Sequence, residues 1–151
     1  IPTGATRQPF DAAMAEVLER HKPALVSFHF GLPSLELLQR ARSTGAKIAS
    51  SATTVAEGLW LQPHDVDLVI AQGLEAGGHR GIFLSEALTT QLGTFALLPQ
   101  LVAALEVPVV AAGGIADTGG VAAAQNLGAA GVQLWVLSVA GPMVVPYCMP
   151  Y

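Results

Sequence analysis

The sequence predicts an α/β protein built around a parallel sheet, and three observations predict it. Segments with strand and helix patterns alternate along the 151 residues, which is typical of βα units. Apolar residues make up 52% of the chain and charged residues only 12%, which fits strands buried on both faces. Glycine and polar residues gather directly after the strand-like segments. The length suits one modest domain.

The first half of the chain alternates helices with strands. Apolar residues recur at helical spacing over residues 10–21, so we expect a helix there. The apolar run at residues 24–28 predicts a strand. Ser34 is a suitable N-cap for an amphipathic helix over residues 35–42. A second strand is expected at residues 47–51.

The middle of the chain contains a third helix, a third strand and a long loop. Thr53 or Thr54 is expected to cap a helix over residues 55–61. The third strand covers residues 67–71. A loop rich in glycine follows it, and the chain is expected to stay irregular to about residue 92.

The last third continues the alternation and then loses it. Apolar side chains lie on one face of a helix expected at residues 94–105. A strand at 108–112, a helix at 119–127 and a strand beginning at 131 follow. From residue 135 to 151 the chain contains three prolines and no helical pattern. We expect this tail to be irregular and residues 1–134 to form the domain.

Two closures of such a sheet are considered, an open doubly wound sheet and a (β/α)8 barrel. No GxGxxG motif follows a first strand, which gives the dinucleotide-binding form little support. In a barrel, functional residues collect at the carboxyl ends of the strands. Here those ends carry FHFG at 28–31, SSAT at 50–53, the glycine-rich loop and AAGGIAD at 111–117. The expected fold class is therefore a TIM (β/α)8 barrel, present in part because only about five βα units are seen.

Composition excludes several classes of function. The net charge is −4 and the seven basic residues are scattered, so no nucleic-acid surface is expected. No apolar run reaches the roughly 18 residues that span a membrane. The single cysteine, Cys148, cannot form an internal disulfide, and we expect an intracellular reducing compartment such as the cytoplasm. A catalytic role for this thiol and a metal site are not expected.

The loop after the third strand, AQGLEAGGHRG at 71–81, carries the strongest functional signal. Its glycines allow a ligand to approach the backbone, and His79 can exchange a proton near neutral pH. We expect a cofactor pocket with His79 as general base, although a lone loop histidine is more often a surface residue. Gln72 could face a planar heterocycle or satisfy local backbone. Glu75 could assist His79 or cap an amide, and Arg80 could bind a phosphate or form a surface salt bridge.

A second glycine pair and a second histidine also lie at strand ends. Gly113 and Gly114 expose backbone N–H groups that could cradle a phosphate, and the alternative is a tight βα turn. His29 could line the same pocket as His79 or simply pack, and packing is the favoured interpretation.

Several motifs together resemble the nitronate monooxygenase family, once called 2-nitropropane dioxygenase. The resemblance runs from about residue 9 to residue 134. It is carried, in order, by VSFHFGLPS at 26–34, AQGLEAGGHRG at 71–81, LLPQLVAAL at 97–105 and VPVVAAGGIADTGGVAAAQNLGAAGVQL at 107–134.

The resemblance implies an FMN-dependent enzyme that oxidises alkyl nitronates or nitroalkanes with O2. His79 matches the family's catalytic histidine. The residues that match flavin contacts or the phosphate site are Gln72, Gly77, Gly78, Gly113, Gly114, Gln133 and Leu134. The alternatives are an FMN-dependent enoyl-acyl carrier protein reductase, a non-catalytic fragment and another phosphate-binding barrel.

The chain departs from the family pattern in two places. Its five strands resemble strands four to eight of an eight-stranded barrel. After Leu134 the family continues with Gly-Thr, whereas this chain has Trp135. A change of reading frame or splice after Leu134 is one hypothesis for this departure. Because unpartnered strands leave apolar faces in water, we expect this chain to fold poorly and to bind FMN weakly.

Overall fold

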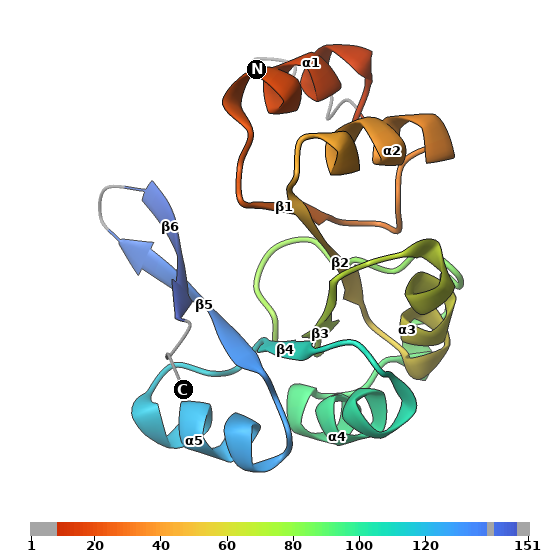
Figure 1. Ribbon diagram of the computed structural model, residues 1–151. Coiled ribbons are helices and arrows are strands. Elements are labelled where there is room, and N and C mark those ends of the chain that lie inside the picture. Colours follow the sequence, from red (N-terminus) through yellow and green to blue (C-terminus); the bar gives the residue numbers. More distant parts are fainter. Residues whose placement is uncertain (1–8, 139–140, 148–151) are drawn as a thin grey trace, which may run out of the picture.

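The computed structural model describes residues 9–138 and 141–147, with side-chain surroundings up to residue 134, and Figure 1 shows its course. The helices are α1 (Ala12–His21), α2 (Leu35–Ser43), α3 (Val55–Leu61), α4 (Thr94–Ala104) and α5 (Thr118–Asn126). The strands are β1 (Leu25–Phe28), β2 (Lys47–Ala52), β3 (Leu68–Gln72), β4 (Val109–Ala112), β5 (Gly131–Ser138) and β6 (Gly141–Tyr147). Two short 3-10 helices are η1 (Gln62–His64) and η2 (Leu88–Thr90).

The sheet has the strand order β1-β2-β3-β4-β5-β6, and β1 to β5 are all parallel. Each parallel strand therefore lies beside its neighbour in the sequence, without the reversal of order that defines a doubly wound sheet. The sheet curves, and the helices lie around its outer side (Figure 1). The five parallel strands form a half-barrel, which confirms the predicted fold class.

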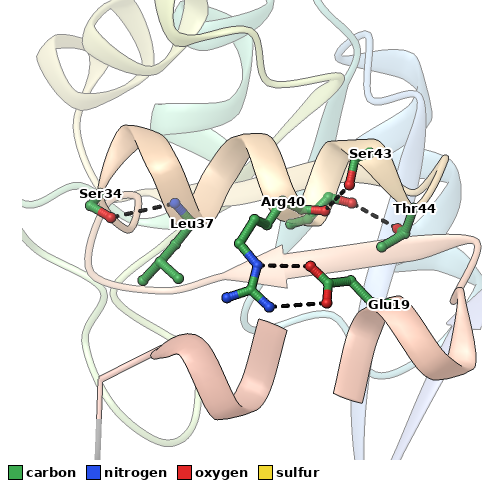
Figure 2. Close-up of polar contacts among 7 residues, drawn as sticks. Glu19, Ser34, Leu37, Arg40, Ser43 and Thr44 are labelled. Atoms are coloured by element: carbon green, nitrogen blue, oxygen red, sulfur yellow. Dashed lines mark hydrogen bonds and ion pairs between the residues drawn. The ribbon is translucent and has the colours of Figure 1, made fainter. Parts of the chain in front are cut away.

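Side-chain caps begin α2 and α3 where the sequence predicts them. The Ser34 hydroxyl accepts a hydrogen bond from Leu37 N at 3.4 Å, as Figure 2 shows for α2. Of the two threonines that could begin α3, Thr54 is the cap, and its hydroxyl accepts from Glu57 N at 3.2 Å. Each cap supplies an acceptor to a backbone N–H that has no partner within the helix.

The first two helices are joined by a forked ion pair (Figure 2). Arg40 Nε and Nη2 donate to the two carboxylate oxygens of Glu19 at 2.7 and 3.0 Å. The hydrogen bonds from Arg40 hold the pKa of the Glu19 carboxyl below its usual value. This contact fixes α1 against α2 beside β1, at the first edge of the half-barrel.

The two faces of the sheet differ in what covers them. The outer face packs fully buried side chains such as Ile48 and Val69 against helix residues such as Leu61 and Leu98. The inner face has a small cluster of its own. Its members are Ala49, Leu68, Ile70, Val110 and Ala112. This apolar cluster reaches Ala112 at the carboxyl end of β4, where polar side chains such as Ser51 and Gln72 lie beside it.

The segment after Leu134 differs from the irregular tail expected from the sequence. Strand β5 continues to Ser138, and β6 pairs with it antiparallel from Gly141 to Tyr147. The physical reason is the run of aromatic and β-branched residues, which favours strands. Prolines are tolerated because β6 is an edge strand. Cys148 lies outside the described residues.

None of the helices in the described part of the chain has both the length and the apolar character needed to cross a membrane.

Candidate functional site

A cavity of about 210 Å3 lies at the carboxyl ends of the parallel strands, on the inner face of the half-barrel. Every parallel strand or the residue that follows it contributes to this cavity. Its lining consists of Ser27, Phe28, His29, Ser51, Ile70, Gln72, Ala76, Gly77, Gly78, His79, Ala112 and Gln133. The structure therefore brings together the sequence-predicted residues Gln72, Gly77, Gly78, His79 and Gln133.

Three predicted residues lie beside the cavity without lining it. Gly113 and Gly114 follow the lining residue Ala112. Leu134 instead lines a separate hollow of about 320 Å3 against α5. It points away because Gln133, its neighbour on β5, faces the cavity and successive strand residues alternate between faces.

The two glycine loops are packed against each other. Gly113 has φ +115°, and a Cβ at this position would lie 2.7 Å from Ala76 N. Gly114 has φ +65°, and its Cβ would lie 3.0 Å from Glu75 Cβ. Both positions require glycine for backbone conformation and for close approach of the neighbouring loop. The alternative given above, a tight βα turn, is therefore enough to explain this glycine pair.

Gln72 holds the loop that carries His79. Its Oε1 accepts from Gly81 N at 2.7 Å, and its Nε2 donates to the His79 carbonyl oxygen at 2.9 Å. Each end of the amide is therefore engaged by loop backbone, which is the alternative that the sequence left open. Gln72 also lines the cavity. Its contact with a cofactor therefore stays a prediction.

His29 reaches the same carbonyl group from the end of β1. Its Nε2 lies 3.0 Å from the His79 carbonyl oxygen, and its Nδ1 lies 3.1 Å from Ser51 Oγ. Because a carbonyl oxygen only accepts, Nε2 carries a proton, and in the neutral ring Nδ1 accepts from the Ser51 hydroxyl. The favoured interpretation of His29 as a packing residue is wrong. It lines the cavity and binds the loop.

Sequence reasoning missed Ser27 and Ser51 as lining residues. The signal that could have found them is their position. Each is a polar residue near the carboxyl end of a strand, in alternation with residues that face the helices.

Glu75 and Arg80 hold backbone near the site. Glu75 Oε2 accepts from Thr94 N at 2.8 Å and from Thr94 Oγ1 at 3.0 Å, at the start of α4. Burial opposes ionisation of Glu75, but the Thr94 hydrogen bonds, its own backbone N–H and Arg80 together hold its pKa below the usual value. Arg80 donates to the carbonyl oxygens of Gly73 and Leu74.

The rim of the cavity is open at Gly77, Gly78 and His79, all of which are exposed. A Cβ added at Gly77 would meet no atom within 4 Å, and its φ is not left-handed. Packing within the described chain thus gives no reason for glycine at this position. The Phe30 ring and the His79 imidazole are nearly perpendicular, with 6.4 Å between ring centroids.

Comparison with known proteins places these features in one family. The family model described as nitronate monooxygenase matches residues 3–136. Nitronate monooxygenase of Paraburkholderia phytofirmans is 47% identical over 130 residues, which is 86% of this chain and 36% of the relative. The nitroalkane oxidase structure from Streptomyces ansochromogenes has a TM-score of 0.74 at 40% identity, covering 81% of this chain and 36% of that one.

The structure of FabK from Thermotoga maritima, as its M276A mutant, is also similar, with a TM-score of 0.70 at 31% identity over 83% of this chain and 39% of that one. The chain thus spans little more than a third of the length of these proteins. The family model nevertheless covers most of its residues, including β1 to β4, most of β5 and the loop that carries His79. The chain therefore belongs to the nitronate monooxygenase family.

Proposed function

We propose that this chain provides the flavin-facing part of a nitronate monooxygenase site, at which an alkyl nitronate or nitroalkane is oxidised with O2. The observation that supports the proposal most directly is the juxtaposition of the exposed His79 with an open glycine rim over a cavity lined by both polar and apolar residues. FMN, when bound, would supply the redox chemistry.

The donor set fits part of a flavin mononucleotide. Gly77 and Gly78 leave open space beside the cavity, where a planar ring could approach the backbone. Ser27, Ser51 and Gln133 offer hydroxyl and amide groups at the cavity wall. The cavity of about 210 Å3 is smaller than the roughly 300–1,000 Å3 of a complete small-molecule site. The described residues are therefore expected to contact only part of the cofactor.

His79 is proposed as the base. Its imidazole would accept the proton from the carbon next to the nitro group, which converts a nitroalkane to its nitronate. Gln72 and His29 would keep this imidazole in place, because both bind the carbonyl group of the same residue. Gly113 and Gly114, together with the backbone of Gln133 and Leu134, are proposed to hold the phosphate.

The test is a titration of the purified chain with FMN, followed by measurement of nitronate-dependent O2 uptake. His79→Asn is expected to retain FMN and to lose about 10²–10⁴-fold in turnover of a nitroalkane. His21→Asn is the matched control, since His21 is exposed at the end of α1, away from the cavity. A second arm supplies an enoyl thioester with NADPH.

A wild type that binds no FMN would contradict the proposal, and so would either of two further outcomes. One is saturable FMN binding with enoyl reduction and no nitronate-dependent O2 uptake. The other is His79→Asn turning over nitroalkane as fast as His21→Asn.

A further inference from the structure

Glu57 on α3 is a carboxylate buried in the half-barrel, with 1% of its surface exposed. Its Oε2 accepts from Thr53 N and from Thr53 Oγ1, each at 2.7 Å. Its Oε1 accepts from Phe83 N at 2.8 Å and from Leu84 N at 3.2 Å. A buried carboxylate is costly unless its oxygens are hydrogen-bonded, and these four donors meet that requirement.

The same carboxylate reaches a second point of the loop through Thr53. Gln91 Nε2 donates to Thr53 Oγ1 at 2.8 Å, and the threonine hydroxyl donates in turn to Glu57. Gln91 is 7% exposed. Glu57 thus holds the long loop between β3 and α4 directly at Phe83 and Leu84 and indirectly at Gln91. The loop is regular only at the short η2, so these side-chain bonds are a large part of what orders it.

This network continues into the cavity described above. Phe83 follows Gly81 by two residues, and Gly81 N donates to Gln72 Oε1. A Cβ at Gly81 would lie 2.7 Å from the His29 ring, so this stretch of backbone lies against both residues that bind the His79 carbonyl group. Glu57 itself is absent from the cavity lining given above. Its influence on the cavity would therefore act through the loop.

We propose that Glu57 is a positioning residue that orders the His79 loop for cofactor binding. The effect on FMN rests on the proposed function, whereas the effect on loop order does not. Glu57→Gln replaces one acceptor oxygen by an NH2 group, so either the donors of Thr53 or those of Phe83 and Leu84 lose their acceptor, and the network that holds the loop is broken without loss of side-chain volume. Glu57→Asp keeps the carboxylate and is expected to restore part of the order.

The experiment compares hydrogen exchange at the amides of Gly81, Phe83 and Leu84 in the wild type and in the variants, together with the FMN dissociation constant. In Glu57→Gln we expect exchange at these amides to rise at least about tenfold, and the dissociation constant to rise by a similar factor, because a buried donor loses its partner. The control is Ile48→Ala, a fully buried residue near the amino end of β2. It should lower global stability without selective exchange in the loop.

The inference is overturned if amide exchange in Glu57→Gln rises uniformly over the protein, as it does in Ile48→Ala, and the NMR signals of the His79 imidazole do not shift. If Glu57→Gln does not fold, Gln91→Leu decides, because it removes the relay to Thr53 and keeps the four bonds to Glu57. If hydrogen exchange at the loop amides of Gln91→Leu equals that of the wild type, the inference is contradicted. A wild type that binds no FMN contradicts the proposed function, while the exchange data still decide the role of Glu57.

Discussion

Gly81→Ala tests whether the His79 loop is held as the structure indicates. The added Cβ would lie 2.7 and 2.9 Å from His29 Cε1 and Nδ1 and 3.0 Å from Gln72 Oε1. The His29 ring has to move, because both of its contacts are shorter than 3.0 Å, whereas Gln72 lies at the tight limit and would add to the cost if it moved too. Moving His29 breaks its bonds to Ser51 and to the His79 carbonyl group. Moving Gln72 breaks its bonds to Gly81 and to the same carbonyl group.

Displacement of His29 alone costs two hydrogen bonds, and at about 1 kcal/mol each the free energy of unfolding should fall by about 2 kcal/mol. Gly77→Ala is the matched control in the same loop. Its Cβ would meet no atom within 4 Å, so the loss of glycine entropy in the unfolded chain should stabilise the fold by about 0.4–1 kcal/mol. The two variants should therefore differ by about 2–3 kcal/mol, with Gly81→Ala the less stable.

Urea denaturation followed by circular dichroism measures this difference, with a common slope for both variants. Equal midpoints for Gly81→Ala and Gly77→Ala would refute the arrangement of His29 and Gln72 around Gly81. FMN titration adds a second comparison. Gly77→Ala should fold normally yet bind the cofactor more weakly, because its methyl group occupies the open rim.

Three further predictions follow. Asp67→Asn should lower the free energy of unfolding at pH 7 by about 1–3 kcal/mol, because Asp67 accepts from Ile48 N and Lys47 Nζ. Although burial opposes ionisation of Asp67, these bonds and Arg42 lower its pKa. The stabilisation by Asp67 is therefore fully present above the ordinary pKa of 3.8 and is lost as the pH falls through the lower pKa of the folded state. Acid titration of the wild type and Asp67→Asn should show the difference between their free energies of unfolding vanish at low pH. His29→Ala should raise exchange at Gly81 more than Ser51→Ala does, because it removes two bonds rather than one. His79→Asn should change the free energy of unfolding by no more than about 0.5 kcal/mol in urea denaturation, since an exposed side chain is replaced.

The elements of the fold could be predicted because their signals are local. The helix expected at residues 35–42 is Leu35–Ser43, and the strand expected at 47–51 is Lys47–Ala52. Apolar periodicity and a cap such as Ser34 are contained within one segment of the chain. The β6 strand was missed because prolines argue against a strand unless it lies at an edge, and edge position follows only from the whole sheet.

The bonds that hold the site could not be predicted in the same way, because they join residues far apart in the sequence. His29 and the His79 carbonyl group are 50 positions apart, and Gln91 and Thr53 are 38 apart. Glu57 had a local signal, since Thr54-x-x-Glu57 has the form of a capping box. That motif predicts that the glutamate accepts a hydrogen bond from the Thr54 N–H. The structure directs the carboxylate to Thr53 and the loop instead.

The inner face of the sheet is the reason to expect low stability for the described chain. Parallel sheets are ordinarily covered on both faces, and here the helices cover the outer one. The inner cluster of Ala49, Ile70 and Ala112 is buried but small, and Leu25 on β1 is 47% exposed. Because apolar area in water forfeits about 25 cal/mol per Å2, the described chain should bind a hydrophobic dye and unfold at low urea. FMN at 100 times its dissociation constant should then raise the free energy of unfolding by about 2.7 kcal/mol. A cooperative transition at high urea without dye binding would show that the inner face is covered.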